Sequence, residues 1–431
     1  MRHFFTFSIL LSLTQYILAQ GSYKQVYQQT GPFGEKIDRY MPIVFRIYPT
    51  VNDQNHYKVY LLSDIVYDYL QFILDDSHYK SEAQFEVNFI DAKNHQVFSR
   101  TWQFQITVNN YKETNRRDKF LFTYDSLIVP AGNYNVHVNY QDLKGQQHQK
   151  FNFKIQLLPI KNFYASPPIF CDLEDNDAQY PPLFPRRPIA LREYLPFNKY
   201  LGLFLTGWIL QDTKVDISIL FKNAESNQLI YKIDTTLSVA HSYFKVFFKL
   251  PSISWDEGNY RLFLRYYFGE DSSKQTLPVK IVWFNKPQSL QELKYAIEPL
   301  RLVMKPEDYK KLNSGNKTER RKAFFSYWKE RDPTPKTALN EMMLEFYSRV
   351  DSADIKWSHN RKGRYGWKTD PGRIYVLYGK PDQIEDTSLD PVNPYMKWIY
   401  YLVDRQLIFK FKAINGRKRY QLVDEQEVKL P

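Results

Sequence analysis

Hydrophobic and polar residues alternate with a period of two along most of the first 285 residues of the chain. Clear examples before residue 160 are PIVFRIYP, QFEVNFID, FSRTWQFQITV, NYNVHVNY and KFNFKIQLL. Successive side chains of a strand point to opposite faces of a sheet, so each segment predicts a strand with one buried face. Short strands separated by turn sequences are typical of antiparallel sandwiches. We therefore predict an Ig-like β-sandwich over residues 41–160, after a polar lead-in over residues 20–40.

The same alternation returns over residues 189–285, in segments such as YLGLFLTGWIL, VDISILF and NYRLFLRYYF. A Gly-Asn-Tyr sequence opens one predicted strand in each region, at Gly132 and at Gly258. The offset between them, 258 − 132 = 126 residues, is about the length of one sandwich domain. The sequence therefore predicts two similar β-sandwich domains in tandem.

A proline-rich segment, ASPPIFCDLEDNDAQYPPLFPRRP, separates these two regions. Proline fixes φ and lacks a backbone donor, so we expect residues 161–188 to be a linker or strap without regular structure. The acidic run from Asp172 to Asp177 offers carboxylates of the kind that bind calcium. It lacks the glycine and the distal glutamate of an EF-hand loop, so no metal site is assigned to it.

Helical periodicity replaces the alternation after Pro287. A charged helix with aromatic residues on one flank is predicted over residues 317–330. The apolar stripe of a second helix consists of Leu339, Met343, Phe346 and Val350, widened by Met342 and Tyr347. Thr334 and Pro335 have the residue types of a helix cap and a first helical turn, so we expect this helix to begin there.

Residues 363–382, GRYGWKTDPGRIYVLYGKPD, contain four of the 15 glycines of the chain. Asp370-Pro371-Gly372 has the residue types of a β-turn, so we expect a turn followed by a strand over residues 373–378. Later strands are predicted at residues 397–403, 407–413 and 420–423, with Asn415-Gly416 as a hairpin turn. Residues 286–431 are thus predicted to form an α+β domain, with a helical layer followed by a small antiparallel sheet.

The stretch GWKTDPGRIYVLYGKPDQI resembles the motif of the GWxTD domain-containing family, a group of exported bacterial proteins. An upstream run resembles a second motif of this family; it includes Tyr327, Trp328, Arg331, Asp332, Pro333, Thr334, Pro335, Asn340 and Glu341. The resemblance covers residues 290–425 and implies an envelope location, with β-domains ahead of the motif domain. It implies no activity. Pro371 stands where the family commonly has an arginine, so any role of that charge is absent here.

The motif region offers candidates for a catalytic site. The polar residues expected to converge are Arg331, Asp332, Asn340, Glu341, Asp370, Arg373 and Asp382. Two carboxylates among Glu341, Asp370 and Asp382 could hydrolyse a glycan by acid–base chemistry. The alternative is a structural network in which Asp370 caps its turn and an arginine ties the helices to the sheet. Further motif residues in that network are Gly366, Trp367, Thr369, Gly372, Gly379 and Pro381. We favour the network and assign no catalytic residue.

Other kinds of site find little support in the sequence. No HExxH, His-x-His or G-x-S-x-G sequence occurs, and His359 is the only histidine in the last 146 residues. Cys171 is the only cysteine, which excludes an intrachain disulfide, and we expect it to be buried. We predict no metal and no cofactor.

The first residues, MRHFFTFSILLSLTQYILAQG, have the layout of a secretory signal over residues 1–19. No later stretch is apolar enough to span a membrane, so we expect a periplasmic or extracellular protein. The net charge is +12, and residues 286–431 carry 29 Lys and Arg against 20 Asp and Glu, or +9. Such a basic region suits an acidic envelope polymer or an acidic protein, whereas export argues against nucleic acid. The alternative, which we favour, is a basic face that is solvated and binds no partner.

These observations predict an exported envelope protein that binds a protein or an envelope polymer and has no catalytic activity. One alternative is an envelope glycan hydrolase that uses a carboxylate pair. Another is a polysaccharide-binding protein. Aromatic residues make up 17% of the chain, and a row of them exposed on a β-face would favour that second alternative.

Overall fold

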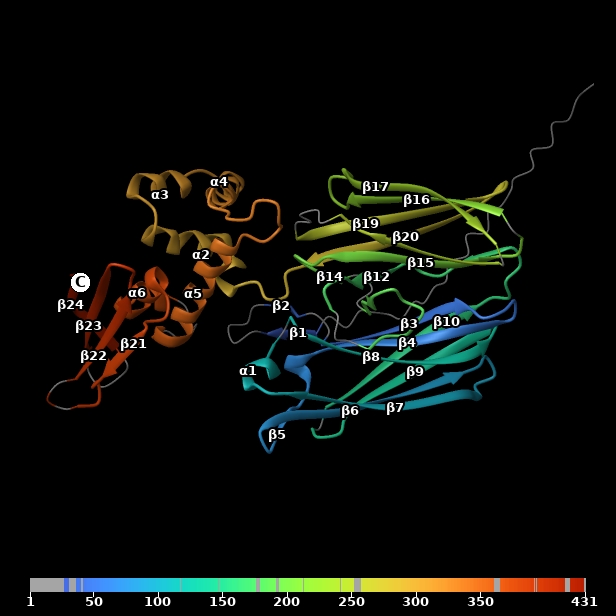
Figure 1. Ribbon diagram of the computed structural model, residues 1–431, viewed down its shortest axis with the longest axis horizontal. Helices are drawn as coiled ribbons and strands as arrows, with labels where there is room; N and C mark the ends of the chain where they lie inside the picture. Colours follow the sequence, from blue (N-terminus) through green and yellow to red (C-terminus); the bar gives the residue numbers. More distant parts are fainter. Residues whose placement is uncertain are drawn as a thin grey trace, which may run out of the picture. The chain divides into compact units, whose positions relative to one another are not determined.

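The protein is described from a computed structural model. It covers residues 27–30, 36–39, 42–116, 118–145, 147–175, 179–190, 194–211, 213–240, 242–251, 257–359, 365–390, 392, 394–414 and 419–429. The predicted signal at residues 1–19 and the predicted Asn415-Gly416 turn lie outside these ranges. The chain divides between Phe284 and Asn285 into two compact units, of which the first is mostly β-sheet and the second carries most of the helices (Figure 1). No helix in the described ranges is long and apolar enough to cross a bilayer.

The first unit begins with a pair of sheets that share one core. One sheet has the order β3-β4-β8, with β3 at Ile43–Val51, β4 at His56–Val66 and β8 at Phe120–Pro130. The other sheet contains β5 (Ile73–Asp75), β6 (His78–Ile90), β7 (Gln96–Val108), β9 (Gly132–Asp142) and β10 (His148–Leu157). A short helix, α1 (Tyr111–Thr114), follows β7. The backbone also forms a small two-stranded sheet of β1 (Tyr27–Thr30) and β2 (Lys36–Arg39).

Alternation of side chains places the apolar faces of these sheets in contact. Strands β3 and β4 depart from the predicted single buried face, because almost all of their residues are buried and their other face packs in a second cluster with the proline-rich segment. Phe45 of β3 and Phe85 of β6 are fully buried, with their ring centroids 5.2 Å apart. Burying a side chain of this size stabilises the fold by about 1.5–3 kcal/mol, and many such residues meet in this core.

A second pair of sheets follows in the same unit. Its first sheet contains β11 (Phe163–Ala165), β12 (Ile169–Asp172), β13 (Arg187–Pro188), β15 (Leu201–Ile209) and β18 (Tyr243–Lys249). The other has the order β14-β20-β19-β16-β17. Its strands are β14 (Tyr194–Pro196), β20 (Asp271–Val282), β19 (Gly258–Phe268), β16 (Thr213–Asn223) and β17 (Leu229–Val239). A separate core lies between these sheets.

The repeated Gly-Asn-Tyr sequence marks equivalent positions in the two sheet pairs. Gly132 opens β9 and Gly258 opens β19. The strand neighbours β10-β9-β6-β7 correspond to β20-β19-β16-β17, and all these pairings are antiparallel. Tyr134 and Tyr260, two residues after the glycines, are both buried. The predicted internal similarity is therefore present in the strand order.

The proline-rich segment differs from its prediction, because β11, β12 and β13 all lie within residues 161–188. Strands β11 and β12 pair with β15, and β13 pairs with β12, so neighbouring strands supply the backbone partners that an isolated proline-rich chain lacks. Cys171 is buried, as predicted. The ring of Phe184 packs 5.5 Å from Tyr48 of β3 and 5.6 Å from Phe204 of β15. The segment thus fills the space between the two sheet pairs and joins their packing.

The second unit begins with helices. These are α2 (Leu293–Ile297), α3 (Pro306–Leu312), α4 (Lys317–Lys329), α5 (Glu341–Trp357) and α6 (Asp370–Tyr378), with 3₁₀ turns η2 (Gln288–Leu290), η3 (Glu298–Leu302) and η4 (Gly366–Lys368). The predicted antiparallel sheet follows in the order β21-β22-β23-β24. Its strands are β21 (Gln383–Asp386), β22 (Tyr395–Tyr401), β23 (Arg405–Ile414) and β24 (Arg419–Lys429).

Two predictions at the start of α5 are wrong. The helix begins at Glu341 rather than near Thr334, because the Asn340 side chain accepts a hydrogen bond from the Met343 N–H at 2.8 Å and acts as the cap. The stripe of Met343, Phe346, Tyr347 and Val350 is buried as predicted, whereas Met342 is half exposed and does not widen it.

The strand predicted over residues 373–378 is also wrong, because these residues belong to α6. A short apolar run such as RIYVLY fits either a strand or a helix, and its flanking residues decide here. Thr369 caps the helix, Pro371 occupies its first turn, and Gly379 ends it with a φ of +82°. The predicted turn at Asp370-Pro371-Gly372 is therefore the first turn of a helix.

Candidate functional site

The Gly366-Trp367 pair forms a close contact with the C-terminal half of α5. A Cβ atom on Gly366 would lie 2.2 Å from the Ala353 carbonyl oxygen, so a side chain at this position would collide with the α5 backbone. Trp367 is fully buried, and its backbone N–H lies 3.3 Å from the Asp354 Oδ1 atom that accepts its hydrogen bond. The guanidinium of Arg301 lies 4.8 Å from the Trp367 ring centroid. This pair therefore fixes the entry of α6 against α5.

Thr369 links η4 to α6 through its hydroxyl group. Its Oγ1 donates to the Gly366 carbonyl oxygen at 2.6 Å and accepts from the Gly372 N–H at 3.2 Å. A Cβ atom on Gly372 would lie 2.0 Å from that same carbonyl oxygen, so only glycine fits here. The two glycines and the threonine therefore form one tight corner, in which the hydroxyl satisfies a helical N–H that has no partner within the helix.

Asp370 joins α6 to the last strand of the sheet. Its Oδ2 accepts a hydrogen bond from the Leu422 N–H of β24 at 2.8 Å, and its Oδ1 lies 3.5 Å from Arg373 Nη2. Strand β24 forms one end of the sheet order, where backbone groups point away from the neighbouring strand. The carboxylate thus satisfies a backbone donor at the sheet edge, while its position in the first turn of α6 suits the helix dipole.

The end of α6 is attached to β22 in a similar way. Gly379 is buried, and its carbonyl oxygen accepts a hydrogen bond from the Tyr400 hydroxyl at 3.0 Å. Burial raises the pKa of Tyr400. Pro381 is buried beside it, and the exposed Asp382 accepts from the Tyr401 N–H at 2.8 Å through Oδ2. The second half of the motif therefore attaches the end of α6 to β22, as Asp370 attaches its start to β24. We call these attachments, together with the Gly366 contact with α5, the joint.

The upstream candidates lie together at the connection between α4 and α5. Arg331 Nη1 donates to the Tyr327 carbonyl oxygen at 2.9 Å, and Asp332 accepts from the Thr334 N–H at 2.9 Å. The amide of Asn340 donates to the Trp328 carbonyl oxygen at 2.6 Å. Glu341 accepts a hydrogen bond from the Thr334 hydroxyl. Each of these side chains stabilises a turn or a helix end.

The predicted set does not meet in a single cluster of contacts. Arg331, Asp332, Asn340 and Glu341 form one group, Asp370 and Arg373 a second, and Asp382 a third. Within the ranges that the structure describes, no hydrogen bond or ion pair joins any two of Glu341, Asp370 and Asp382. Each of these carboxylates accepts a hydrogen bond from a donor in its own part of the domain, which is the arrangement that the structural alternative predicts.

Two acidic residues of α5, Asp351 and Asp354, contribute to this site and were not predicted from the sequence. Asp351 accepts hydrogen bonds from the Gln288 N–H at 2.6 Å and the Ser289 N–H at 3.0 Å. Burial raises the pKa of the Asp351 carboxyl group, against the lowering effect of those bonds. Asp354, one turn later, is the buried acceptor for Trp367. Their signal in the sequence is an i, i+3 acidic pair beside the apolar stripe of a predicted helix.

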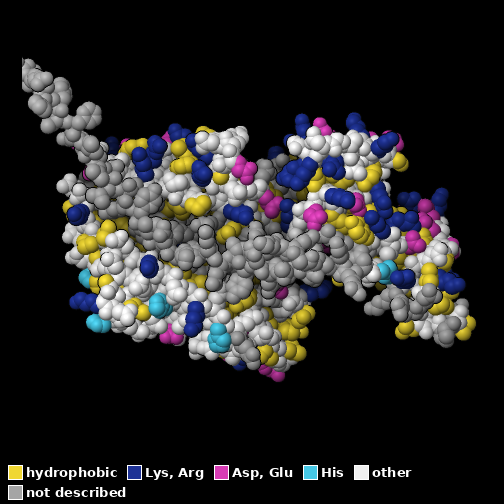
Figure 2. Space-filling model, turned by 180° about the vertical axis from the view of Figure 1, so that it is seen from behind, with side chains coloured by type: hydrophobic (Ala, Val, Ile, Leu, Met, Phe, Trp, Pro, Cys, Tyr) yellow, Lys and Arg dark blue, Asp and Glu magenta, His cyan; other side chains and the backbone are white. Residues whose placement is uncertain are grey.

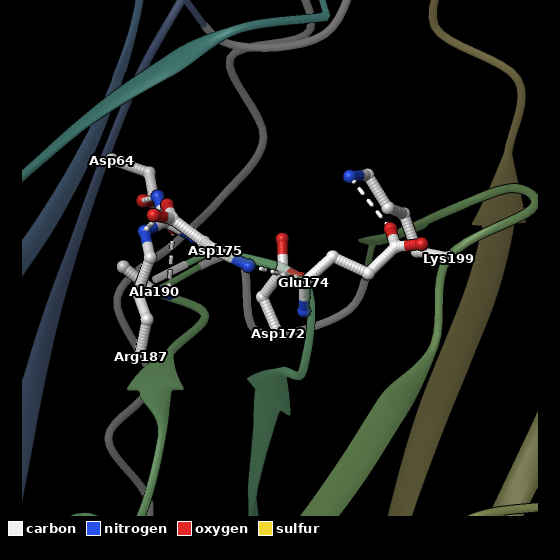
Figure 3. A network of polar contacts seen from close by, with 7 residues as sticks. All are labelled: Asp64, Asp172, Glu174, Asp175, Arg187, Ala190 and Lys199. Atoms are coloured by element: carbon white, nitrogen blue, oxygen red, sulfur yellow. Dashed lines mark hydrogen bonds and ion pairs between the residues drawn. The ribbon is translucent and has the colours of Figure 1, made fainter. Parts of the chain in front are cut away.

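The described acidic residues of the proline-rich segment form ion pairs and a turn hydrogen bond (Figure 3). The buried Arg187 of β13 contacts the buried Asp64 of β4, and its Nε lies 3.0 Å from Asp175 Oδ2. Glu174 pairs with Lys199 at 2.8 Å, while Asp172 accepts the Glu174 N–H at 2.9 Å. Among the described residues, no group of three or more His, Cys, Asp or Glu side chains could hold a metal ion.

Comparison with known families agrees with the resemblance seen in the sequence. A family model, the GWxTD domain, matches residues 265–430, which include the whole joint between α5, α6 and the sheet. The chain therefore contains a GWxTD domain over these residues. No curated protein matches its sequence. In this GWxTD domain, the five positions that name the motif include a glycine with no room for a side chain, a buried tryptophan, a helix cap and a bond to the sheet edge.

Two solved structures that match this chain do so with low TM-scores. Bacteroides uniformis β-glucuronidase 2, covalently bound to cyclophellitol-6-carboxylate aziridine, matches 54% of this chain at 6% identity and a TM-score of 0.22. Parabacteroides merdae β-glucuronidase matches 53% of it at 12% identity and a TM-score of 0.20. The chain covers 27% and 28% of those two proteins. TM-scores this low establish neither a shared fold nor a shared activity.

Proposed function

We propose that this GWxTD protein is exported to the cell envelope, in the periplasm or outside the cell, and binds a protein or an envelope polymer there without catalysis. One observation carries the proposal. The carboxylates Glu341, Asp370 and Asp382 each accept a hydrogen bond from a different part of the GWxTD domain, and the described contacts join none of them to another. They hold the domain together, which leaves binding as the role that the geometry supports best.

The remaining architecture fits a binding role. We propose that the two sheet pairs are tandem Ig-like sandwiches that present the GWxTD domain to its partner. Phe184 and the Asp64–Arg187 ion pair connect the sheet pairs, so they would act as one spacer rather than as two independent modules.

The polysaccharide-binding alternative gains no support from the aromatic residues. In the described part of the first unit, the exposed tyrosines are Tyr111, Tyr200 and Tyr267. Tyr111 lies on α1 and Tyr267 on β19, while Tyr200 precedes β15, so the three do not follow one strand face. A linear sugar chain would need neighbouring rings on one surface.

Capture from the envelope tests this proposal. Residues 20–431 would be immobilised and incubated with solubilised envelope proteins and with isolated envelope polymers, and the retained material would be identified by mass spectrometry and sugar analysis. We expect saturable retention of one component, unchanged by Asp382→Asn, because Asn keeps an acceptor for the Tyr401 N–H. The proposal would be contradicted if the folded protein retained no more material than a denatured control. It would also be contradicted if a polymer were shortened during the incubation.

A further inference from the structure

Helix α4 presents a cationic face with one aromatic residue at its centre. The helix buries Phe324 and Trp328, while Phe325 is 48% exposed. Residues three and four positions apart are neighbours on a helix, so Arg321, Lys322 and Lys329 surround Phe325 at i−4, i−3 and i+4. All three cations are exposed, and the Arg321 guanidinium lies 5.3 Å from the Phe325 ring centroid. We call these four residues the α4 face.

The charge of this helix is strongly one-sided. Its five cations are Lys317, Arg320, Arg321, Lys322 and Lys329, and its one carboxylate is Glu319. Glu319 is already engaged, because it accepts a hydrogen bond from the Asn316 N–H at 2.8 Å in a capping box. On α3, by contrast, the exposed Lys310 and Lys311 are balanced by the exposed Glu307 and Asp308. Figure 2 shows Lys and Arg side chains gathered over the part of the second unit that carries α3 and α4 in Figure 1.

Several cations elsewhere in the same unit have acidic partners. Lys368 pairs with Glu298 at 3.1 Å, Arg349 with Glu345 at 2.7 Å, and Arg405 with Glu427 at 2.9 Å. By contrast, no described carboxylate lies within ion-pair distance of a cation of α4. The positive charge of the α4 face is thus not neutralised by an ion pair within the described part of the unit and is available to an external anion.

We propose that the α4 face docks on an anionic lipid surface. Phosphate headgroups would pair with Arg321, Lys322 and Lys329, and the apolar layer beneath the headgroups would receive the Phe325 ring. An acidic polymer or protein segment matches the cations but offers no such layer to the ring. A helix face is convex, which suits an extended surface better than a small enclosed ligand. The inference rests on the proposed envelope location for its setting, whereas the binding itself is testable with purified protein.

The test is co-sedimentation of residues 20–431 with vesicles. One set contains phosphatidylcholine alone, and the other contains phosphatidylcholine with phosphatidylglycerol. We expect binding to the anionic vesicles only, weakening as salt is raised. The triple variant Arg321→Glu, Lys322→Glu, Lys329→Glu should bind at least about a hundredfold more weakly. Each basic residue near such a surface raises the affinity about five- to tenfold. Phe325→Ser should weaken binding about tenfold.

A charge-matched control separates this face from net charge. Lys150, Lys154 and Lys161 are exposed on or after β10, and changing all three to Glu alters the net charge by the same amount. The control should retain binding. Equal loss in both triple variants, or equal binding to both kinds of vesicle, would overturn the inference. Binding to poly-glutamate but not to the vesicles would also overturn it and would identify an acidic protein as the partner. Envelope capture without vesicle binding would overturn only the lipid inference and leave the proposed function standing.

Discussion

Asp370 at the start of α6 accepts a hydrogen bond from the backbone N–H of Leu422, 52 residues further along the chain, at 2.8 Å. The bond ties the first turn of a helix to the end strand of a sheet. One carboxylate thereby satisfies a backbone donor at the sheet edge and lies near the positive end of the helix dipole. The acidic residue of the GWxTD motif is thus part of a joint between helix and strand.

Removing this carboxylate should destabilise the second unit. In Asp370→Ala the Leu422 N–H loses its acceptor, which costs about 1–3 kcal/mol. Asp370→Asn keeps an amide oxygen and should lose less. Urea unfolding monitored by hydrogen exchange of β24 amides would measure both. Asp404→Ala is the control, because Asp404 is 77% exposed and its pairing with Arg405 at 3.7 Å should contribute almost nothing. If Asp370→Ala and Asp404→Ala changed the free energy of unfolding equally, the hydrogen bond between Asp370 and Leu422 would not stabilise the unit.

Gly366→Ala should weaken the packing of α6 on α5. The new methyl group would lie 2.2 Å from the Ala353 carbonyl oxygen, so helix or corner must move, at a cost of about 3 kcal/mol. Gly258→Ala is the matched control, since the nearest atom to its Cβ would be 3.8 Å away. Circular dichroism during thermal unfolding would compare the two variants. A Gly366→Ala protein as stable as the control would show that the close contact is absent.

The buried ion pair of the first unit predicts a non-additive result. Arg187→Met leaves the Asp64 carboxylate buried without its cation, which costs about 3–5 kcal/mol. Adding Asp64→Asn removes that charge and keeps an acceptor for the Ala190 N–H, so the double variant should recover much of the stability. Lys199→Ala removes the half-exposed pair with Glu174 and should change stability by less than about 1 kcal/mol. Urea midpoints of these variants give the comparison, and additive losses would argue against a buried pair.

Asp351 should make the second unit less stable as the pH rises. Burial raises the pKa of its folded-state carboxyl group above the unfolded value of about 3.9. The folded state therefore binds this proton more tightly, so stability falls as the pH increases from about 4 through the raised pKa. Asp351→Asn removes the titration, and its stability should decline less over the same range. Parallel pH profiles of the two proteins would contradict this assignment.

Cys171 should be unreactive in the folded protein. Burial raises the pKa of its thiol to about 12, so almost no thiolate is present at pH 8 and reagents cannot reach the sulfur. We expect no labelling by a thiol reagent at pH 8 and one label per chain in denaturant. Rapid labelling of the folded protein would show that the packing around the proline-rich segment opens.

The strands were predictable from the sequence because their signal is local. Alternation such as that in NYNVHVNY states which side chains face the core, and β9 follows it residue by residue. Helix α6 was not predictable in the same way. The run RIYVLY also suits a strand, and it becomes a helix because Thr369 caps it and Gly372 fits against the Gly366 carbonyl oxygen. The joint could not be predicted either, since Asp370 and Leu422 are far apart in the sequence and only the fold brings them together.

The proposed function requires that the motif carboxylates Glu341, Asp370 and Asp382 build the domain and perform no hydrolysis. Its most direct test is the chain-length distribution of isolated envelope glycans after incubation with residues 20–431, or with the Asp370→Asn and Asp382→Asn variants. We expect an unchanged distribution in every case, together with lower stability of the Asp370→Asn variant. Shortening by the unmodified protein that disappears in a folded Asp370→Asn variant would contradict it and identify Asp370 as a catalytic residue.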